Sequence, residues 1–151
     1  MEARMKHPVM TVPDAMQALQ ALGKAVHKTG LSPQLIELVN LRASQINGCS
    51  VCVEMHSRAL KAAGESDERI FGVAAWRETP YFDEAERAAL ALAEAVTRLS
   101  DRADAVPDAI WEDAVRSFDE EALAGLVLAI AQINVWNRLN AATRQMAGTA
   151  W

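Results

Sequence analysis

Apolar residues in this chain recur at the spacing of an α-helix, and no stretch alternates apolar and polar residues at the period of two that a half-buried β-strand requires. No β-hairpin turn signal was found either. Hydrophobic residues make up 51% of the 151 residues and aromatic ones only 5%, while alanine is abundant, which favours closely packed helices. The sequence therefore predicts an all-α fold.

Capping residues and helix breakers divide the chain into six to seven expected helices. Ser32 before Pro33 and Asp119 before two glutamates are typical helix starts, and Gly64 is a typical stop. Asp14 is the expected cap of the first helix. The expected helices cover about residues 14–27, 33–46, 49–63, 68–76, 83–99, 107–118 and 119–146.

The chain has the length of one domain and contains no linker or low-complexity segment. We expect an N-terminal arm over residues 1–12, in which Pro8 and Pro13 interrupt regular structure, followed by one helical domain over residues 13–151. This organisation leaves the whole helical part available for a single core.

Charge and hydropathy exclude several classes of function. The formal net charge is −5 and no run of Lys or Arg stands out, so we expect no nucleic-acid partner. The first ten residues lack the apolar stretch of a signal peptide. The longest apolar run, residues 122–131, is too short to span a bilayer. We therefore expect a soluble, cytoplasmic protein without a membrane partner.

The last expected helix is apolar on nearly all sides over its first three turns. In so small a chain this predicts that subunits cover one another's surfaces, and hence an oligomer. Asn134, Asn137 and Arg144 form a polar stripe further along this helix. Because buried polar groups need partners, we expect them to bond to loops or to a neighbouring subunit rather than to form a site.

Both cysteines of the chain, Cys49 and Cys52, form a C-x-x-C pair, and His56 follows four residues later. Asn47 and Gly48 end the preceding helix, so the pair lies at the start of a new helix, on which positions 49, 52 and 56 share one face. A structural disulfide closing so small a loop would add little stability. The helix N-terminus favours a thiolate, so these side chains predict thiol–disulfide chemistry.

Glu37, on the preceding helix, reaches His56 only if the turn at Gly48 folds the two helices side by side. There it can orient the imidazole, which takes the proton of Cys52. One thiolate then attacks the O–O bond of a hydroperoxide, the second closes a disulfide, and an external dithiol restores both thiols. Peroxide reduction is the reaction that such a site would perform.

Other interpretations of these residues stay open. Cys49, Cys52 and His56 could be three zinc ligands, with Glu37 as a conceivable fourth in a catalytic site, but the chain has no second C-x-x-C or H-x-x-x-H. A thioredoxin-type protein is disfavoured because no βαβ pattern surrounds the pair. The remaining alternatives are two inert buried cysteines and, for Glu37 alone, a solvated surface acid.

The spacing of these residues resembles the motif of a known protein family. Glu37, eleven residues, Cys49-x-x-Cys52-x-x-x-His56, within RASQINGCSVCVEMH, resembles the core motif of the alkyl hydroperoxidase D-like (AhpD-like) group of the carboxymuconolactone decarboxylase superfamily. INVWNRLNAATR, residues 133–144, also resembles single-domain members. The resemblance implies an all-α bundle that assembles as a homo-trimer or homo-hexamer.

The resemblance also implies an antioxidant role and assigns the site. Cys52 corresponds to the cysteine that attacks the peroxide, Cys49 to the resolving and electron-accepting one, and Glu37 with His56 to the proton relay. Family members bind no tight cofactor and draw electrons from an external dithiol, in the best-known cases a lipoyl protein. One position departs: Val51 stands where well-studied members have a histidine, so a second base near Cys49 is missing.

Two alternatives to the peroxidase follow from the same residues. The first is a decarboxylase-like enzyme that acts on a small lactone acid through His56 and Glu37, with the cysteines incidental. The second is a non-enzymatic redox-sensing protein, whose thiols oxidise without turnover by a dithiol.

Overall fold

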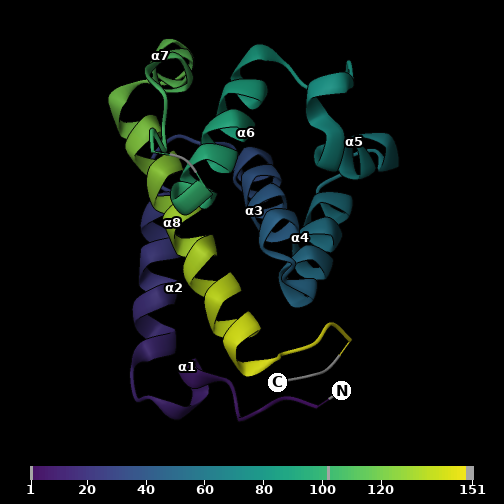
Figure 1. The fold of residues 1–151 in the computed structure, drawn as a ribbon, viewed down its shortest axis with the longest axis vertical. Coiled ribbons are helices and arrows are strands. Elements are labelled where there is room, and N and C mark those ends of the chain that lie inside the picture. Colours follow the sequence, from purple (N-terminus) through teal and green to yellow (C-terminus); the bar gives the residue numbers. More distant parts are fainter. Residues whose placement is uncertain (1, 102, 149–151) are drawn as a thin grey trace.

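The computed structural model describes residues 2–101 and 103–148, which form eight α-helices, two short 3-10 helices and no strand (Figure 1). The expected all-α class is confirmed. The helices are α1 (Pro8–Thr11), α2 (Ala15–Val26), α3 (Pro33–Asn47), α4 (Ser50–Ala62), α5 (Asp67–Gly72), η1 (Val73–Glu78), α6 (Glu84–Thr97), η2 (Leu99–Asp101), α7 (Asp108–Ser117) and α8 (Glu120–Thr143).

The structure departs from the expected helices near the N-terminus. Pro8 does not interrupt regular structure; it occupies the first turn of α1, where its missing N–H removes no helical hydrogen bond. The expected arm of residues 1–12 thus contains a helix. Asp14 occupies the N-cap position of α2, as expected, but its side chain makes no capping hydrogen bond. Residue 1 of the arm and residues 149–151 of the expected domain lie outside the described residues.

Helix α3 packs against α4, α6 and α8 and lies between them (Figure 1). Its side chains Leu38, Val39 and Leu41 are fully buried, because its apolar residues face neighbours on several sides. Leu38 and Leu41 pack in a cluster with α4 and η1, whereas Val39 packs with residues of α2, α6 and α8. The two core clusters therefore meet at α3.

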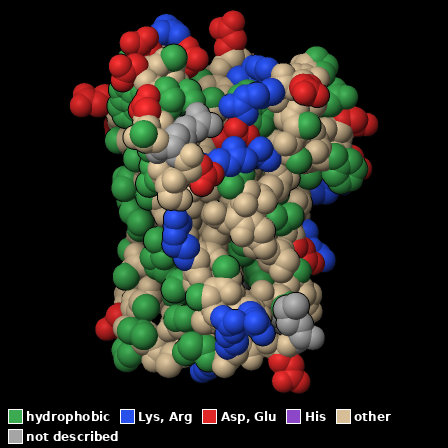
Figure 2. Space-filling view, viewed as in Figure 1, with side chains coloured by type: hydrophobic (Ala, Val, Ile, Leu, Met, Phe, Trp, Pro, Cys, Tyr) green, Lys and Arg blue, Asp and Glu red, His purple; other side chains and the backbone are tan. Residues whose placement is uncertain are grey.

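Helix α8 is the only described helix that is long and apolar enough to cross a bilayer. Half of its most apolar 18-residue window is buried inside the protein, as in the core helix of a soluble protein. Two large apolar side chains of α8, Leu128 and Val135, are nevertheless exposed. Figure 2 shows hydrophobic side chains gathered along the flank where α2 and α8 lie. The expectation that other subunits cover such surfaces stays a prediction.

A buried carboxylate on α6 ties three elements together. Glu94 is 6% exposed and accepts hydrogen bonds from Trp76 Nε1 (2.9 Å), from Arg42 Nε (2.7 Å) and from Arg77. Burial raises the pKa of this carboxyl, but the hydrogen bonds from Trp76, Arg77 and Arg42 outweigh burial and hold the pKa below its ordinary value. The ionised carboxylate therefore links α3, η1 and α6.

The chain reverses direction between α3 and α4. Gly48 ends α3 with φ of 66°, in the left-handed region, and a Cβ placed there would meet nothing within 4 Å. Cys49 then caps α4. Only glycine adopts this conformation without strain, so the expected helix stop at Asn47 and Gly48 is confirmed.

We predict that Glu94→Ala lowers the free energy of unfolding by roughly 3 kcal/mol, because it removes the acceptor of the buried Trp76 and the ion-pair partner of the partly buried Arg42. Urea unfolding followed by circular dichroism at neutral pH measures the change. The exposed carboxylate Glu112 on α7 supplies the control, and Glu112→Ala should change stability by less than about 0.5 kcal/mol. Equal losses in the two variants would contradict a structural role for the buried cluster.

The same cluster predicts a dependence on pH. The folded-state pKa of Glu94 lies below the ordinary value of 4.5. Its contribution to stability is therefore present above that value and is lost as the pH falls through the folded-state pKa. The difference in stability between the wild type and Glu94→Ala should shrink in acid, and a difference that grows would contradict the assignment.

We predict that Gly48→Ala costs about 1–2 kcal/mol of stability through backbone strain alone. Gly64, just after α4, has φ of 89° and equally open surroundings, so Gly64→Ala is the matched control. Both variants should lower the melting temperature. Only Gly48→Ala, which moves the start of α4, should also change the reduction potential of the Cys49–Cys52 pair in thiol–disulfide redox buffers. An equal effect of both variants on the potential would overturn this.

Candidate active site

Cys49 and Cys52 are joined by a disulfide, with their Cα atoms 5.4 Å apart. Cys49 is the N-cap of α4, and its Sγ accepts a hydrogen bond from the backbone N–H of Cys52 at 3.3 Å. The pair thus lies at the helix start, as its sequence predicts. Cys49 is 4% exposed and Cys52 only 1%. Free N–H groups and the helix dipole favour a negative charge at this position.

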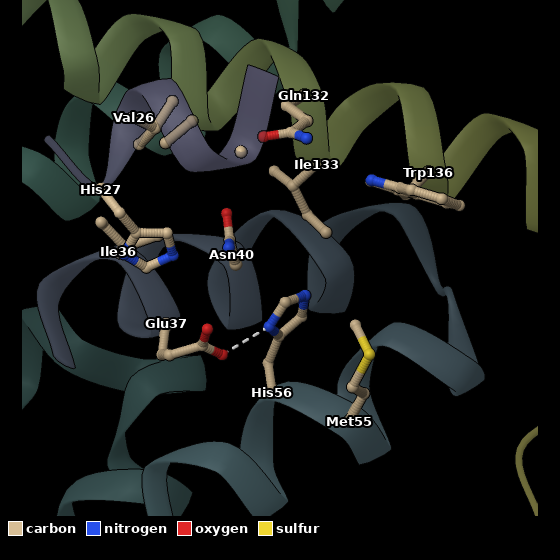
Figure 3. Close-up of a pocket in the computed structure, with 12 residues that line it drawn as sticks. Val26, His27, Ile36, Glu37, Asn40, Met55, His56, Gln132, Ile133 and Trp136 are labelled. Atoms are coloured by element: carbon tan, nitrogen blue, oxygen red, sulfur yellow. Dashed lines mark hydrogen bonds and ion pairs between the residues drawn. The ribbon is translucent and has the colours of Figure 1, made fainter. Parts of the chain in front are cut away.

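The structure brings Glu37 and His56 together. Because α4 packs along α3, Glu37 Oε2 lies 2.6 Å from His56 Nδ1 (Figure 3). A carboxylate can only accept this hydrogen bond, so Nδ1 carries the proton and the neutral ring has its lone pair on Nε2. Nε2 is buried and has no hydrogen-bond partner among the described residues. His56 lies one helical turn after Cys52, with its ring ready to accept a proton.

A cavity of about 160 Å³ opens beside this pair, between α2, α3, α4 and α8 (Figure 3). Two of the lining residues have a buried atom without a hydrogen-bond partner in the part of the chain that the structure describes, Asn40 Oδ1 and His56 Nε2. Neither cysteine is among the lining residues. Ile133 and Trp136 line the cavity and also pack with the disulfide cluster, which consists of Ala43, Cys49, Cys52 and Ile133. The remaining lining residues are Gly23, Val26, His27, Ile36, Glu37, Met55, Ala129 and Gln132.

A second cleft, of about 210 Å³, lies on the Cys49 side of the disulfide. The end of α8 and the segment after it form its other wall, with Asn140 and Arg144 among the lining residues. Cys52 does not line this cleft. The two cysteines therefore differ in surroundings: Cys49 borders a surface cleft, whereas Cys52 lines neither this cleft nor the cavity.

Asn140 is a site residue that the sequence analysis missed. It is 2% exposed, and its Nδ2 donates hydrogen bonds to Cys52 Sγ at 3.2 Å and to Cys49 Sγ at 3.5 Å. A signal was present, since Asn140 follows Asn137 by three residues and so continues the polar stripe of α8. The stripe therefore does reach the site.

The partners expected for the polar stripe were wrong. Asn47 Nδ2 donates to Asn134 Oδ1 (2.9 Å) and to Asn137 Oδ1 (2.8 Å), which bonds α8 to the end of α3 instead of to a loop or another subunit. Asn137 Nδ2 donates to Ser44 Oγ at 3.1 Å. Arg144 caps the end of α8 with φ of 54° and takes no part in this network. Packing between helices, which spacing does not reveal, decides these partners.

His7 also reaches the site, from the expected arm. Its side chain is buried, its ring centroid lies 5.8 Å from that of Trp136, and it lies beside the Asn140 side chain. Burial lowers the pKa of His7, and the polar side chain of Asn140 offsets this only in part. A histidine thus lies near the cysteine pair although position 51 is valine.

The described residues offer no cluster of metal-binding side chains that would support the interpretation as a zinc site. Within residues 2–101 and 103–148, no group of three or more His, Cys, Asp or Glu side chains is arranged to hold a metal ion. Val51, which stands in place of the histidine of well-studied family members, packs against the disulfide cluster instead. The protein groups available for chemistry here are therefore the two sulfurs, the His56–Glu37 pair and the Asn140 amide.

Comparison with known proteins places the chain in a family. Residues 13–95, more than half of the chain, match the carboxymuconolactone decarboxylase family. The uncharacterized protein YdfG of Bacillus subtilis is 34% identical over 137 residues, which are 91% of this chain and 92% of that protein. A shorter stretch of 41 residues is 44% identical to the alkyl hydroperoxide reductase AhpD of Bradyrhizobium diazoefficiens, and covers 27% of this chain and 22% of that one.

The fold is also found in a solved structure of the same size. The crystal structure of the Agrobacterium tumefaciens protein ATU0492, a protein of unknown function described as a candidate antioxidant defence protein AhpD, superposes with a TM-score of 0.90 at 34% identity. The superposition covers 99% of this chain and all of that one. With its AhpD-like fold, this chain belongs to the carboxymuconolactone decarboxylase family.

Proposed function

We propose that this protein is a thiol-dependent hydroperoxide reductase with an antioxidant role, in which Cys52 and Cys49 are the redox pair. The observation that carries the proposal is the hydrogen bond between Glu37 and His56, one helical turn from Cys52, with the second ring nitrogen unpartnered among the described residues. A paired carboxylate holds the imidazole in the tautomer that accepts a proton. Two inert cysteines would need no such base beside them.

In the first half of the reaction, His56 Nε2 takes the proton of Cys52, directly or through one water. The Cys52 thiolate attacks the O–O bond of ROOH; an S–O bond forms, the O–O bond breaks, and the alkoxide leaves as ROH with the proton held by His56. Cys49 then attacks the sulfenic sulfur as its thiolate. The disulfide closes, and hydroxide leaves as water with the proton that Cys49 gave up.

In the second half, an external dithiol reduces the disulfide. Its thiolate attacks Cys49, which borders the open cleft, and the enclosed Cys52 leaves as thiolate. The second thiol of the donor then releases Cys49. Two electrons and two protons of the dithiol thus convert ROOH into ROH and water. We propose a lipoyl protein as this donor and no tightly bound cofactor.

The proposal also includes the location and the oligomeric state of the protein. We expect a cytoplasmic protein. We also expect a homo-trimer or homo-hexamer, because the exposed apolar side chains of α8 offer a surface that a second subunit can cover. We propose neither a nucleic-acid partner nor a membrane partner.

We predict that the reduced protein loses two thiols rapidly when one equivalent of tert-butyl hydroperoxide is added. Cys49→Ser should still consume peroxide, because Cys52 forms a sulfenic acid, whereas Cys52→Ser should not. A free-thiol titration beside stopped-flow mixing measures both, and the same protein unfolded in urea supplies the rate of an unassisted thiol. Oxidation no faster than in urea would sink the peroxidase, and a dead Cys49→Ser with an active Cys52→Ser would reverse the two roles.

We predict that Glu37→Gln slows the oxidation of Cys52 by roughly 10²-fold, because the neutral amide no longer stabilises the protonated imidazole. Glu78→Gln, an exposed glutamate in η1, is the control and should react as the wild type does. The rate constant is measured against pH in both variants. Equal rates at every pH would remove Glu37 from the mechanism.

One observation favours a second candidate, a decarboxylase-like enzyme that acts on a small lactone acid. The cavity beside the Glu37–His56 pair is lined by neither cysteine, so a ligand in it would meet the imidazole without meeting a thiol. Substituting both cysteines by serine separates the two functions, because it abolishes peroxide reduction and spares chemistry at His56. If instead the thiols oxidise but no dithiol restores them in turnover, the protein is a redox sensor.

A further inference from the structure

Asn140 contacts the sulfur that the proposed reaction turns into a thiolate. Its Nδ2 lies 3.2 Å from Cys52 Sγ, and both residues are at most 2% exposed. A hydrogen bond donated to an anion in such a buried position stabilises the anion much more than it stabilises a neutral thiol or a disulfide sulfur. The structure contains the oxidised pair, so the donor is already in place when reduction generates the thiolate.

An asparagine amide can face a sulfur in two ways, and only one of them helps. Rotation about its last bond exchanges Nδ2 with Oδ1, and an oxygen facing a thiolate would repel it. Some neighbour of Asn140 must therefore select the orientation in which Nδ2 faces Cys52. The contacts of His7 provide that selection.

The hydrogen bond that His7 accepts determines which of its ring nitrogens carries the proton. Its Nδ1 accepts a hydrogen bond from the backbone N–H of Val9 at 3.3 Å, so in the neutral ring the proton is on Nε2. Toward the Asn140 side chain, which lies beside it, the ring can then act only as a donor. A donor at this place favours the amide orientation in which Oδ1 faces the ring and Nδ2 faces the sulfurs.

The N-terminal arm is held at this place by bonds of its own. Arg4 N donates to Thr143 O at 2.8 Å, Arg4 Nη1 donates to Ala142 O at 3.0 Å, and Gln145 Nε2 donates to Met5 O at 3.1 Å. The arm and the segment after α8 therefore run together at the end of the molecule where α8 stops (Figure 1). His7, next along the chain, is buried against Trp136.

We propose that Asn140 is a catalytic residue that donates a hydrogen bond to the Cys52 thiolate, and that His7 is a positioning residue that orients the Asn140 amide for this role. The N-terminal arm thus completes a site whose other residues come from α3, α4 and α8. The significance for turnover rests on the proposed function, but the hydrogen bond to the thiolate does not. In the reaction it stabilises Cys52 twice, as the attacking thiolate and as the leaving thiolate when a dithiol reduces the disulfide.

The test measures the Cys52 thiolate without any peroxide. In the Cys49→Ser background Cys52 is the single thiol, and its ionisation is followed by the ultraviolet absorbance of the thiolate and by the rate of alkylation with iodoacetamide. Asn140→Leu should raise the pKa of Cys52 and slow alkylation at neutral pH about tenfold. His7→Leu should change both in the same direction, whereas His7→Gln, which keeps an N–H donor, should restore both toward the values of the parent.

A control separates this effect from general damage. Asn137 is a buried amide one turn earlier on α8 that bonds to Asn47 and Ser44 instead of to sulfur. Asn137→Ala should lower the melting temperature and leave the pKa of Cys52 unchanged. An unchanged pKa in Asn140→Leu would overturn the whole proposal, and a pKa that His7→Leu does not move, or that His7→Gln fails to restore, would overturn the role of His7.

A measurement on the wild-type chain covers the case in which a substitution prevents folding. The side-chain amide resonances of Asn140, in a two-dimensional NMR spectrum, should shift on reduction and titrate together with Cys52. Resonances that do not move would overturn the proposal. If these effects are found but peroxide is not reduced, the proposed function fails and the inference stands; fast peroxide reduction with none of these effects is the reverse outcome.

Discussion

Gly48 adopts a left-handed backbone conformation, and the reversal that it allows turns α4 back along α3. Two consequences follow from this one turn. Cys49 becomes the N-cap of a new helix, and its sulfur accepts a hydrogen bond from the backbone N–H of Cys52. At the same time Glu37 comes within hydrogen-bond distance of His56, nineteen residues later in the chain. The redox pair and its base therefore depend on the same backbone conformation.

Helix α8 is hydrogen-bonded to the end of α3, directly before the turn at Gly48. The amides of Asn134 and Asn137 bond to Asn47 at the end of α3, which keeps α8 in a defined position relative to the turn. Buried amides are costly unless all of them are paired, so such a network specifies one packing and disfavours others. Asn140, on the same helix, contacts the sulfurs directly. Asn134 and Asn137 thus contribute to the packing of α8 on α3, and Asn140 contributes to the site.

The disulfide has two different surroundings. Ile133 and Trp136 lie between it and the cavity that the Glu37–His56 pair lines, whereas Cys49 itself borders the second cleft. Family membership and the AhpD-like fold are shown by the comparisons, while the direction of the chemistry is the proposal that thiol and peroxide measurements decide.

Local interactions explain what the sequence by itself determined. The all-α class, the caps at Ser32 and Asp119 and the start of a helix at Cys49 depend on residues a few positions apart, and all of them were predicted. The nearness of Glu37 and His56 was expected through a family resemblance, because spacing alone does not tell how two helices pack.

Only the tertiary structure decided the rest. Pro8 looked like a breaker but begins α1, and its neighbour His7, placed in an arm, lies in the site. Asn140 follows Cys52 by 88 residues, and no periodicity connects them. Burial and the direction of each hydrogen bond arise when distant segments pack together, and for that reason the local pattern located the cysteines but not the side chains that surround them.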